Sequence, residues 1–247
     1  MVVIEGPRAT SLTRALSERL RAKAYRWDEV KGEEVEGMEV LLVHPVAEPF
    51  ERYLESALSI SERASRGARR MVLAVPYMGI RASGRALQYL AGGLDLVGAD
   101  HVVMADPSPE VIAAIKTPLV AVSAYPGIAG WLSGRLAEAR VAAPPRLENR
   151  AEAFAELVGA ELRILPGDRP EELGELDGEV LLWDLVTSCE ELGELAGLRA
   201  AYYAIPHVGC GEPLGGIGDR VVASDSVDNP YSKVTLADAL AGAVLTI

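Results

Sequence analysis

The second half of the sequence repeats the first half, and this duplication limits the folds open to the chain more than any other feature. Four segments of the first half recur, in the same order, in the second half. The matched pairs are Pro7-Arg8 with Pro145-Arg146, residues 37–42 with 178–182, residues 67–79 with 197–209, and residues 100–106 with 219–225. Ordered internal similarity of this kind indicates two homologous structural units. We therefore expect two lobes, residues 1–140 and 141–247, with residues 234–247 as a candidate helix that crosses back.

Within the first half, short apolar runs alternate with amphipathic stretches. The runs that predict strands are residues 2–4, 40–43, 71–75, 102–104 and 119–122. The stretches that predict helices are residues 11–23, 50–66, 81–97, 110–116 and 127–139. Alternating strands and helices of this length are typical of an α/β fold, in which a largely parallel sheet is covered by helices on both faces.

Composition excludes several classes of partner. The chain has 36 acidic and 24 basic residues and a net charge of -12, so it repels the nucleic acid backbone and offers no basic stripe. No apolar run approaches the roughly 18 residues of a membrane span, and the start of the chain lacks the basic residues and cleavage site of a secretory signal. We expect a soluble, cytoplasmic protein with no nucleic acid partner and no membrane partner.

The two cysteines and the few side-chain amides carry weaker signals. Cys189 and Cys210 do not form a C-x-x-C pair, so two buried or incidental thiols are favoured over a disulfide. Gln88 is the only glutamine, and Asn149 and Asn229 are the only asparagines. Scarcity of thermolabile amides beside many charged residues is typical of thermophilic proteins.

Residues 182–192 form the stretch best placed to hold a ligand. The apolar run 180–182 predicts a buried strand, and Asp184, Thr187 and Ser188 follow its carboxyl end, where ligands bind in open α/β sheets. Backbone N–H groups and a helix N-terminus at such a place can hold a phosphate, although Glu190 and Glu191 add two negative charges there. The alternative is structural: Asp184 caps a turn, and Thr187 and Ser188 cap the helix that follows.

The order of motifs resembles the ribose-phosphate pyrophosphokinases, or PRPP synthetases, which make phosphoribosyl pyrophosphate (PRPP) from ribose 5-phosphate and ATP. Residues 75–81 are similar to the family's Pro-Tyr-x-x-Tyr-x-Arg-Gln-Asp segment, and residues 98–106 to its Gly-Ala-Asp-x-Val strand. Residues 182–190 are similar to its Asp-Asp-x-x-x-Thr-Gly-Gly-Thr loop. The resemblance implies two tandem phosphoribosyltransferase-type lobes, each a largely parallel sheet flanked by helices.

The resemblance also implies site residues. The expected ATP contacts are Tyr77 and Arg81, and the expected metal ligand is Asp106, with Mg²⁺ and ATP required if the chain is active. The expected ribose-phosphate contacts are Asp184, Thr187, Ser188 and His207, the last because residues 206–209 are similar to a Thr-His-Gly segment near the ribose. Structural alternatives exist for three of these residues: a surface ion pair for Arg81, local packing for Tyr77 and a strand-end position for His207.

The sequence departs from the family where the chemistry takes place. Ala82-Ser83 replaces Gln-Asp after Arg81, Ser108 replaces a metal-side histidine, and Glu161-Leu-Arg163 replaces a catalytic Lys before Arg. Cys189-Glu190 replaces two glycines of the ribose-phosphate loop. A carboxylate about 4 Å from a phosphate costs on the order of 4 kcal/mol at an effective dielectric of about 20. We therefore assign no catalytic residue.

Three hypotheses follow. The first is a PRPP synthetase homologue connected with nucleotide biosynthesis that has lost catalysis and is a structural or regulatory partner, as a homo-oligomer or as a hetero-oligomer with a catalytic paralogue. The second is an active, divergent enzyme that uses Asp106, Asp184, Arg81 and Arg163 with Mg²⁺ to bind a nucleotide and a sugar phosphate. The third is a small-molecule sensor whose loop accepts an uncharged or cationic ligand beside Glu190 and Glu191.

Overall fold

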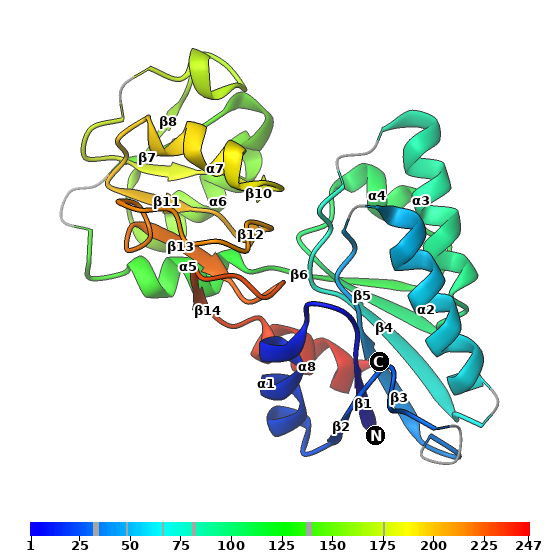
Figure 1. The fold of residues 1–247 in the computed structure, drawn as a ribbon. Helices are drawn as coiled ribbons and strands as arrows, with labels where there is room; N and C mark the ends of the chain where they lie inside the picture. The colour runs from blue at the N-terminus through cyan, green and yellow to red at the C-terminus, as the bar shows by residue number, and fades with distance from the viewer. Residues whose placement is uncertain (32–34, 48, 66, 81–82, 137–139, 175) are drawn as a thin grey trace. The chain divides into compact units, whose positions relative to one another are not determined.

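The structure is a computed structural model that describes residues 1–247 except 32–34, 48, 66, 81–82, 137–139 and 175. It divides into two compact units (Figure 1). The first unit is Met1–Ser123 with Leu236–Ile247, and the second is Ala124–Thr235. The first boundary differs from the one expected near residue 140, because the second unit already begins at Ala124. The expected helix that crosses back is confirmed, because Leu236–Ile247 returns to the first unit.

The first unit is built on a parallel six-stranded sheet. Its strands are β1 (Val2–Glu5), β2 (Lys23–Arg26), β3 (Glu39–Val43), β4 (Arg70–Val75), β5 (His101–Ala105) and β6 (Leu119–Val122), in the order β2-β1-β3-β4-β5-β6. Its helices are α1 (Thr10–Leu20), α2 (Phe50–Ser65), α3 (Gly84–Leu96), α4 (Pro109–Ala114) and α8 (Ala237–Thr246). All neighbouring strands pair in parallel, so every strand ends at the same edge of the sheet.

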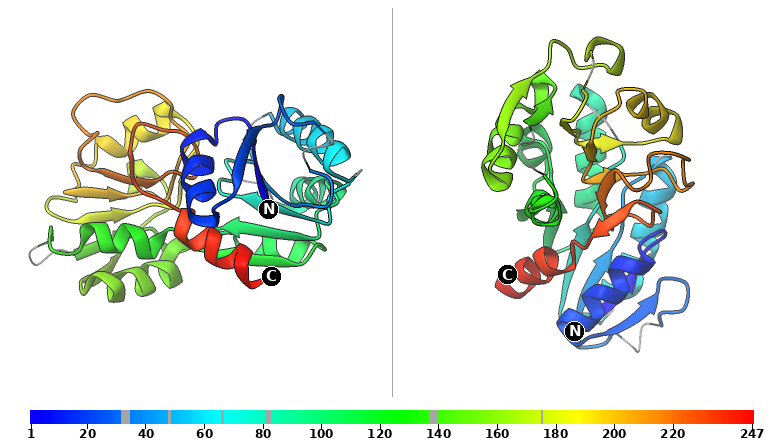
Figure 2. Two further views of the ribbon diagram at one scale, coloured as in Figure 1. Left: turned by 90° about the horizontal axis from the view of Figure 1, so that it is seen from below. Right: turned by 90° about the vertical axis from the view of Figure 1, so that its left-hand side faces the viewer.

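Helices cover both faces of this sheet. Side chains of β1, β3, β4 and β5 alternate between the two faces, and the alternate set that includes Ile4, Leu42 and Leu73 packs into one core cluster with Tyr53 of α2 and Leu90 of α3. The helices α1 and α8 pack together on the opposite face, as two views of the ribbon show (Figures 1 and 2). The apolar strand runs are buried because helices lie above and below them.

The second unit repeats this architecture. Its strands are β7 (Arg140–Ala143), β8 (Glu161–Ile164), β9 (Val180–Leu182), β11 (Tyr202–Ala204), β13 (Val221–Ser224) and β14 (Ser232–Val234), with a separate pair of β10 (Leu185–Val186) and β12 (His207–Val208). Its helices are α5 (Tyr125–Leu132), α6 (Glu148–Val158) and α7 (Cys189–Ala196), with short 3₁₀ turns at Pro145–Leu147 and Pro170–Glu172. The strand order β8-β7-β9-β11-β13-β14 is the order of the first unit.

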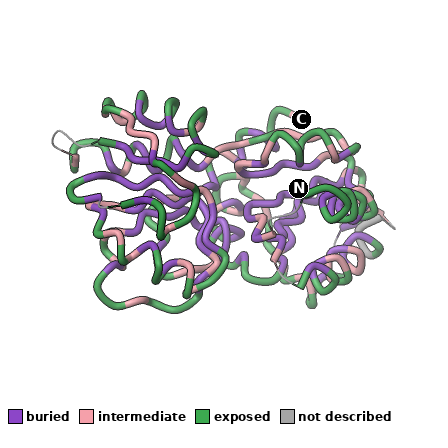
Figure 3. The backbone as a smooth tube through the Cα atoms, turned by 90° about the horizontal axis from the view of Figure 1, so that it is seen from above, coloured by how far each residue is buried: buried purple, intermediate pink, exposed green. Residues whose placement is uncertain are grey.

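The matching orders agree with the duplication in the sequence. The repeated segments 37–42 and 178–182 lead into β3 and β9, segments 67–79 and 197–209 contain β4 and β11, and segments 100–106 and 219–225 contain β5 and β13. The predicted α/β class is confirmed: each unit has a parallel six-stranded sheet flanked by helices. In Figure 3 the strands of both sheets consist mainly of buried residues, whereas the helices and connecting segments contain both buried and exposed residues.

Several element bounds differ from those predicted. The helix expected to run to residue 23 ends at Leu20, because Arg21 takes a left-handed conformation with φ of 48°, and residues 23–26 form the edge strand β2. The helix expected over 127–139 ends at Leu132, and residues 137–139 lie outside the described part of the chain. Within the part of the chain that the structure describes, no helix is long and apolar enough to cross a membrane.

Candidate functional site

The predicted phosphate loop lies at the carboxyl ends of the strands of the second unit. Strand β9 ends at Leu182, Trp183 and Asp184 follow, and β10 then pairs in parallel with β12, with Leu185 opposite His207. Helix α7 begins three residues after β10. Four predicted contacts, Asp184, Thr187, Ser188 and His207, therefore belong to one end of one sheet.

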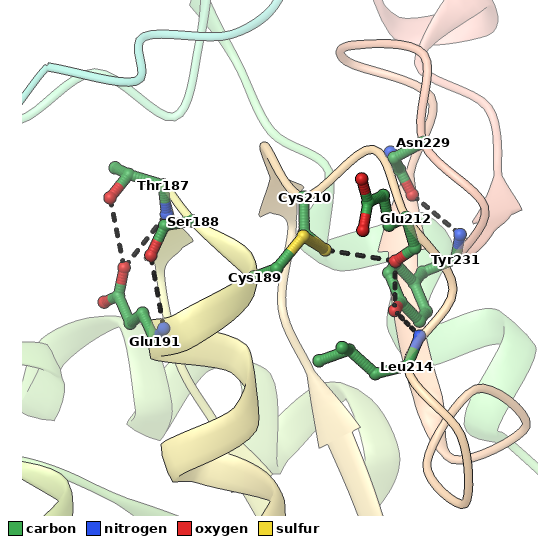
Figure 4. The surroundings of a disulfide bond; sticks show 9 residues. All are labelled: Thr187, Ser188, Cys189, Glu191, Cys210, Glu212, Leu214, Asn229 and Tyr231. Atoms are coloured by element: carbon green, nitrogen blue, oxygen red, sulfur yellow. Dashed lines mark hydrogen bonds between the residues drawn. A yellow bond between two sulfur atoms is a disulfide. The ribbon is translucent and has the colours of Figure 1, made fainter.

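The loop binds a carboxylate of its own chain where a phosphate was expected. The Glu191 Oε2 atom accepts a hydrogen bond from the backbone N–H of Thr187 at 2.9 Å and another from the Thr187 hydroxyl at 3.2 Å (Figure 4). In return, Ser188 Oγ accepts the backbone N–H of Glu191 at 3.2 Å. Ser188 is thus the N-cap of α7, the structural role that the sequence left open for it, and Glu191 neutralises the start of the helix dipole.

A disulfide joins Cys189 to Cys210, so the expectation of two separate thiols is wrong. The pairing of β10 with β12 is the reason. Both strands run in the same direction with Val186 opposite Val208, and the two cysteines follow within three residues of these positions. Their Cα atoms lie 4.7 Å apart, within the usual range for a disulfide. Sequence spacing alone could not reveal this register.

The segment after Cys210 is anchored by a single tyrosine. The Tyr231 hydroxyl donates to the carbonyl oxygen of Glu212 at 2.8 Å and accepts the backbone N–H of Leu214 at 2.6 Å. Asn229 accepts the Tyr231 N–H at 2.9 Å, and the Tyr231 side chain is only 1% exposed. Cys210 is also buried, so hydrogen bonds and packing hold the chain in place at this end of the disulfide (Figure 4).

Asp184 is held by a neighbouring cation. The guanidinium of Arg146, in the turn after β7, lies 2.9 Å from the Asp184 carboxylate and 4.3 Å from the centre of the buried Trp183 ring. The backbone N–H of Arg146 also donates to Asp168 at 3.2 Å. Asp184 thus engages an arginine, and the capping of the next turn that the sequence suggested is replaced by an ion pair. The internal repeat matches Pro145-Arg146 with Pro7-Arg8, but it does not indicate that Arg146 pairs with Asp184.

The other predicted residues of the second unit are engaged in different ways. His207 is 6% exposed and pairs with Leu185 along β12, so its main chain helps to fix the loop. Arg163, a residue of the hypothesis of an active enzyme, donates to the carboxylate of the buried Glu179. That contact satisfies a carboxylate which burial would otherwise make costly.

The predicted residues of the first unit lie at the strand ends of its own sheet. Tyr77 follows β4 and is 2% exposed, and a Cβ built on Gly79 would lie 2.3 Å from its ring, so the two residues are in close contact. Asp106 follows β5, with a left-handed φ of 47° and its N–H donating to Val122 at 2.8 Å. Arg81 lies outside the described residues. Among the residues described, no group of three or more His, Cys, Asp or Glu side chains is placed to hold a metal ion.

Comparison with known proteins places the fold. No family model matches the chain, and no curated protein matches it in sequence. Among solved structures, the crystal structure of phosphoribosylpyrophosphate synthetase from Mycobacterium smegmatis is similar, with a TM-score of 0.73 and 17% sequence identity. The match covers 99% of this chain and 97% of that one. The two-unit architecture is therefore that of a PRPP synthetase-like fold.

Proposed function

We propose that the chain is a divergent homologue of PRPP synthetases that has lost efficient catalysis and is a structural or regulatory partner. Support for the ancestry comes from full-length similarity of fold to a phosphoribosylpyrophosphate synthetase together with the order of motifs in the sequence. Because fold alone does not carry function, we infer lost catalysis from the residues of the site.

The single observation that carries the proposal is the contact between Glu191 and Thr187. Both donors of Thr187 already have an anionic acceptor supplied by the same chain. A phosphate would have to displace this carboxylate and then sit beside it and beside Glu190. At about 4 Å each like-charge pair costs on the order of 4 kcal/mol at an effective dielectric of about 20, about as much as the whole free energy of a millimolar interaction.

Asp184 also fits Mg²⁺ poorly. Asp184 is paired with Arg146, and the part of the chain that the structure describes holds no cluster of three metal ligands. Mg²⁺ prefers near-octahedral oxygen coordination built from carboxylates, waters and substrate phosphates. A carboxylate bound to a guanidinium is a weaker ligand because its charge is already compensated. These residues do not provide the usual setting for phosphoryl transfer from ATP.

The activity assay that tests the proposal uses the whole purified chain with ribose 5-phosphate, ATP and Mg²⁺. A PRPP synthetase whose motifs are intact is assayed in parallel as the reference. We expect this chain to form AMP and PRPP no faster than an enzyme-free control. Formation of both products at a rate comparable to that reference would contradict lost catalysis and support the hypothesis of an active enzyme.

The partner role has its own experiment. The chain is mixed with an intact PRPP synthetase from the same source and separated by size-exclusion chromatography, and the synthetase rate is measured with and without it. We expect co-elution and a changed rate. Separate elution with an unchanged rate contradicts the role as partner of a synthetase. The elution volume of the chain alone then tests whether it forms a homo-oligomer.

A further inference from the structure

We propose that the Cys189–Cys210 disulfide is a redox-sensitive latch, which holds the start of α7 in place so that the Glu191 carboxylate stays hydrogen-bonded to Thr187. Reduction of the bond by a dithiol then releases the first turn of α7. This inference rests on the proposed function, because it describes regulation of the same loop.

The disulfide joins the start of α7 to a segment that hydrogen bonds hold in place. Cys189 is the first residue of α7, and it follows the capping Ser188 and precedes Glu191 by two residues in the sequence (Figure 4). Cys210 lies in the segment that Tyr231 anchors through Glu212 and Leu214. The covalent bond therefore holds the start of α7 at a set place relative to rigid backbone.

Helix α7 depends on such a tether. It has 8 residues, about two turns, and helices of this length are marginal by themselves. Its buried residues are Leu192 and Leu195, and the partly buried Cys189 packs against the same core cluster. The residues before Leu192 are held by this contact, the cap, the Glu191 contacts and the disulfide. Helix ends open more readily than helix centres, so loss of the tether acts on the turn that carries Glu191.

The two sulfur atoms differ in access, which sets the order of the chemistry. Cys210 is 1% exposed, whereas Cys189 is partly exposed at the start of α7, so a reductant reaches Cys189 first. A thiolate of the dithiol attacks Sγ of Cys189, the S–S bond breaks, and Cys210 leaves as a thiolate that takes up a proton. The second thiol of the reductant then displaces Cys189. The protein gains two electrons and two protons, and the dithiol becomes a disulfide.

The reduced form has a place for its new thiol. Sγ of Cys210 lies 3.1 Å from the carbonyl oxygen of Glu212. A disulfide sulfur carries no hydrogen, so this is only a contact in the oxidised chain. After reduction, the Cys210 thiol can donate to that oxygen, which satisfies the buried group without moving the segment. Reduction is therefore expected to change the Cys189 side more than the Cys210 side.

Amide hydrogen exchange by NMR tests the latch on the whole chain. The wild-type protein is compared after air oxidation and after treatment with dithiothreitol, and alkylation with mass spectrometry counts the free thiols in each sample. We expect zero and two free thiols, and exchange of the Thr187 amide about tenfold faster after reduction, the factor for losing a charge-assisted hydrogen bond. Exchange in β9 and β11 remains unchanged.

Three variants keep the result interpretable. Replacing both cysteines with serine (C189S/C210S) is expected to give fast Thr187 exchange with or without dithiothreitol. Glu191→Gln is expected to speed Thr187 exchange in the oxidised protein, while Glu194→Gln, the same charge change at an exposed position of α7, leaves it unchanged. Two free thiols after air oxidation, or equal Thr187 exchange in oxidised and reduced wild type, overturns the latch.

Failure of the latch and failure of the proposed function are distinguishable. PRPP synthesis at an ordinary rate by both oxidised and reduced protein refutes lost catalysis and leaves the exchange result to decide the latch. Equal exchange in both forms refutes the latch, whatever the assay for PRPP gives.

Discussion

The guanidinium of Arg146 lies 2.9 Å from the carboxylate of Asp184 and stacks on the ring of Trp183 at 4.3 Å. One cation thus compensates the acid that the sequence marked as a ribose contact and covers a buried aromatic ring. Because both charged side chains are partly exposed, solvent screening reduces the stabilisation that this ion pair contributes.

Replacing Arg146 with alanine removes both contacts, together with a longer ion pair to Asp168 at 3.9 Å. We expect the free energy of unfolding to fall by about 1–2 kcal/mol, the sum of a partly exposed ion pair and a cation–π contact. Urea denaturation followed by fluorescence measures it. A double-mutant cycle with Asp184→Ala isolates the pair, for which we expect a coupling of about 0.5–1 kcal/mol. A coupling of zero would assign the loss to packing on Trp183.

Removing the disulfide lowers stability through the unfolded state. The bond closes a loop with a sequence separation of 21, for which the chain-entropy relation gives about 3 kcal/mol. We expect the Cys189→Ala/Cys210→Ala variant to lose about this amount in guanidinium unfolding under oxidising conditions. In dithiothreitol the variant and the wild type should be nearly equal. A difference that persists in dithiothreitol would show that the side chains, and not the cross-link, carry the effect.

His44 makes stability depend on pH. It is buried at the end of β3, with Nε2 2.7 Å from Ser56 Oγ and the ring of Tyr53 edge-on to it. Burial lowers the pKa of His44 from 6.5 to about 4, and the Pro45 carbonyl offsets part of this shift. Between these values the unfolded chain binds more protons than the folded chain. The contribution is therefore complete above pH 6.5 and is lost as pH falls toward 4.

The expected loss from His44 is about 2 kcal/mol at pH 5 relative to pH 7. Urea unfolding at both pH values measures it, with His44→Gln as the control that lacks this contribution and retains the carboxylate effects. The fall in stability should be smaller in the variant by this amount. A His44 imidazole that titrates near 6.5 by NMR would contradict the assignment.

Gly79 reports whether Tyr77 is packed as the structure shows. An alanine Cβ at position 79 would lie 2.3 Å from the Tyr77 ring, so Gly79→Ala forces one of the two residues to move. We expect a loss of about 1–3 kcal/mol, the usual cost of overpacking. Gly92→Ala is the matched control, because nothing lies within 4 Å of its Cβ in α3, and helix propensity predicts a gain of up to about 1 kcal/mol. Thermal unfolding of both variants separates the two effects.

Most of the fold could be predicted because buried strands leave a strong signal. Runs such as residues 40–43 and 71–75 became β3 and β4 almost without change. The edge strands β2 and β8 were missed, because three of the four residues of β2 are exposed and its Lys and Arg side chains hide any apolar pattern. An edge strand pairs on one side only and needs fewer apolar residues, so its sequence resembles a helix end or a loop.

The candidate site could be located but its state could not be predicted. The position of Thr187 and Ser188 after a buried strand, and the capping role of Ser188, follow from local rules. The partners of Asp184 and Cys189 depend on register and on turns far along the chain: Arg146 is 38 residues from Asp184, and Cys210 is 21 residues from Cys189. Only the tertiary fold brings such residues together.

Glu191→Gln tests directly whether the loop is closed by its own carboxylate. The substitution keeps an oxygen acceptor for Thr187 and removes the negative charge that opposes a phosphate. Without ligand we expect a loss of about 1 kcal/mol in stability, since a charge-assisted hydrogen bond and a favourable dipole contact are weakened. With ribose 5-phosphate we expect binding at least about tenfold tighter than in the wild type, equivalent to about 1.4 kcal/mol. Isothermal titration calorimetry at constant salt measures it.

Glu194→Gln makes the same change in net charge on the same helix, at an exposed position, and serves as the control. If Glu191 acts as the internal ligand, Glu194→Gln binds ribose 5-phosphate no better than the wild type does, because a screened surface charge changes affinity little. If both variants bind equally well, overall charge governs affinity and the loop is not closed by Glu191. If neither binds at millimolar ligand, the missing glycines at 189 and 190 are the larger obstacle, since the backbone there cannot approach a phosphate.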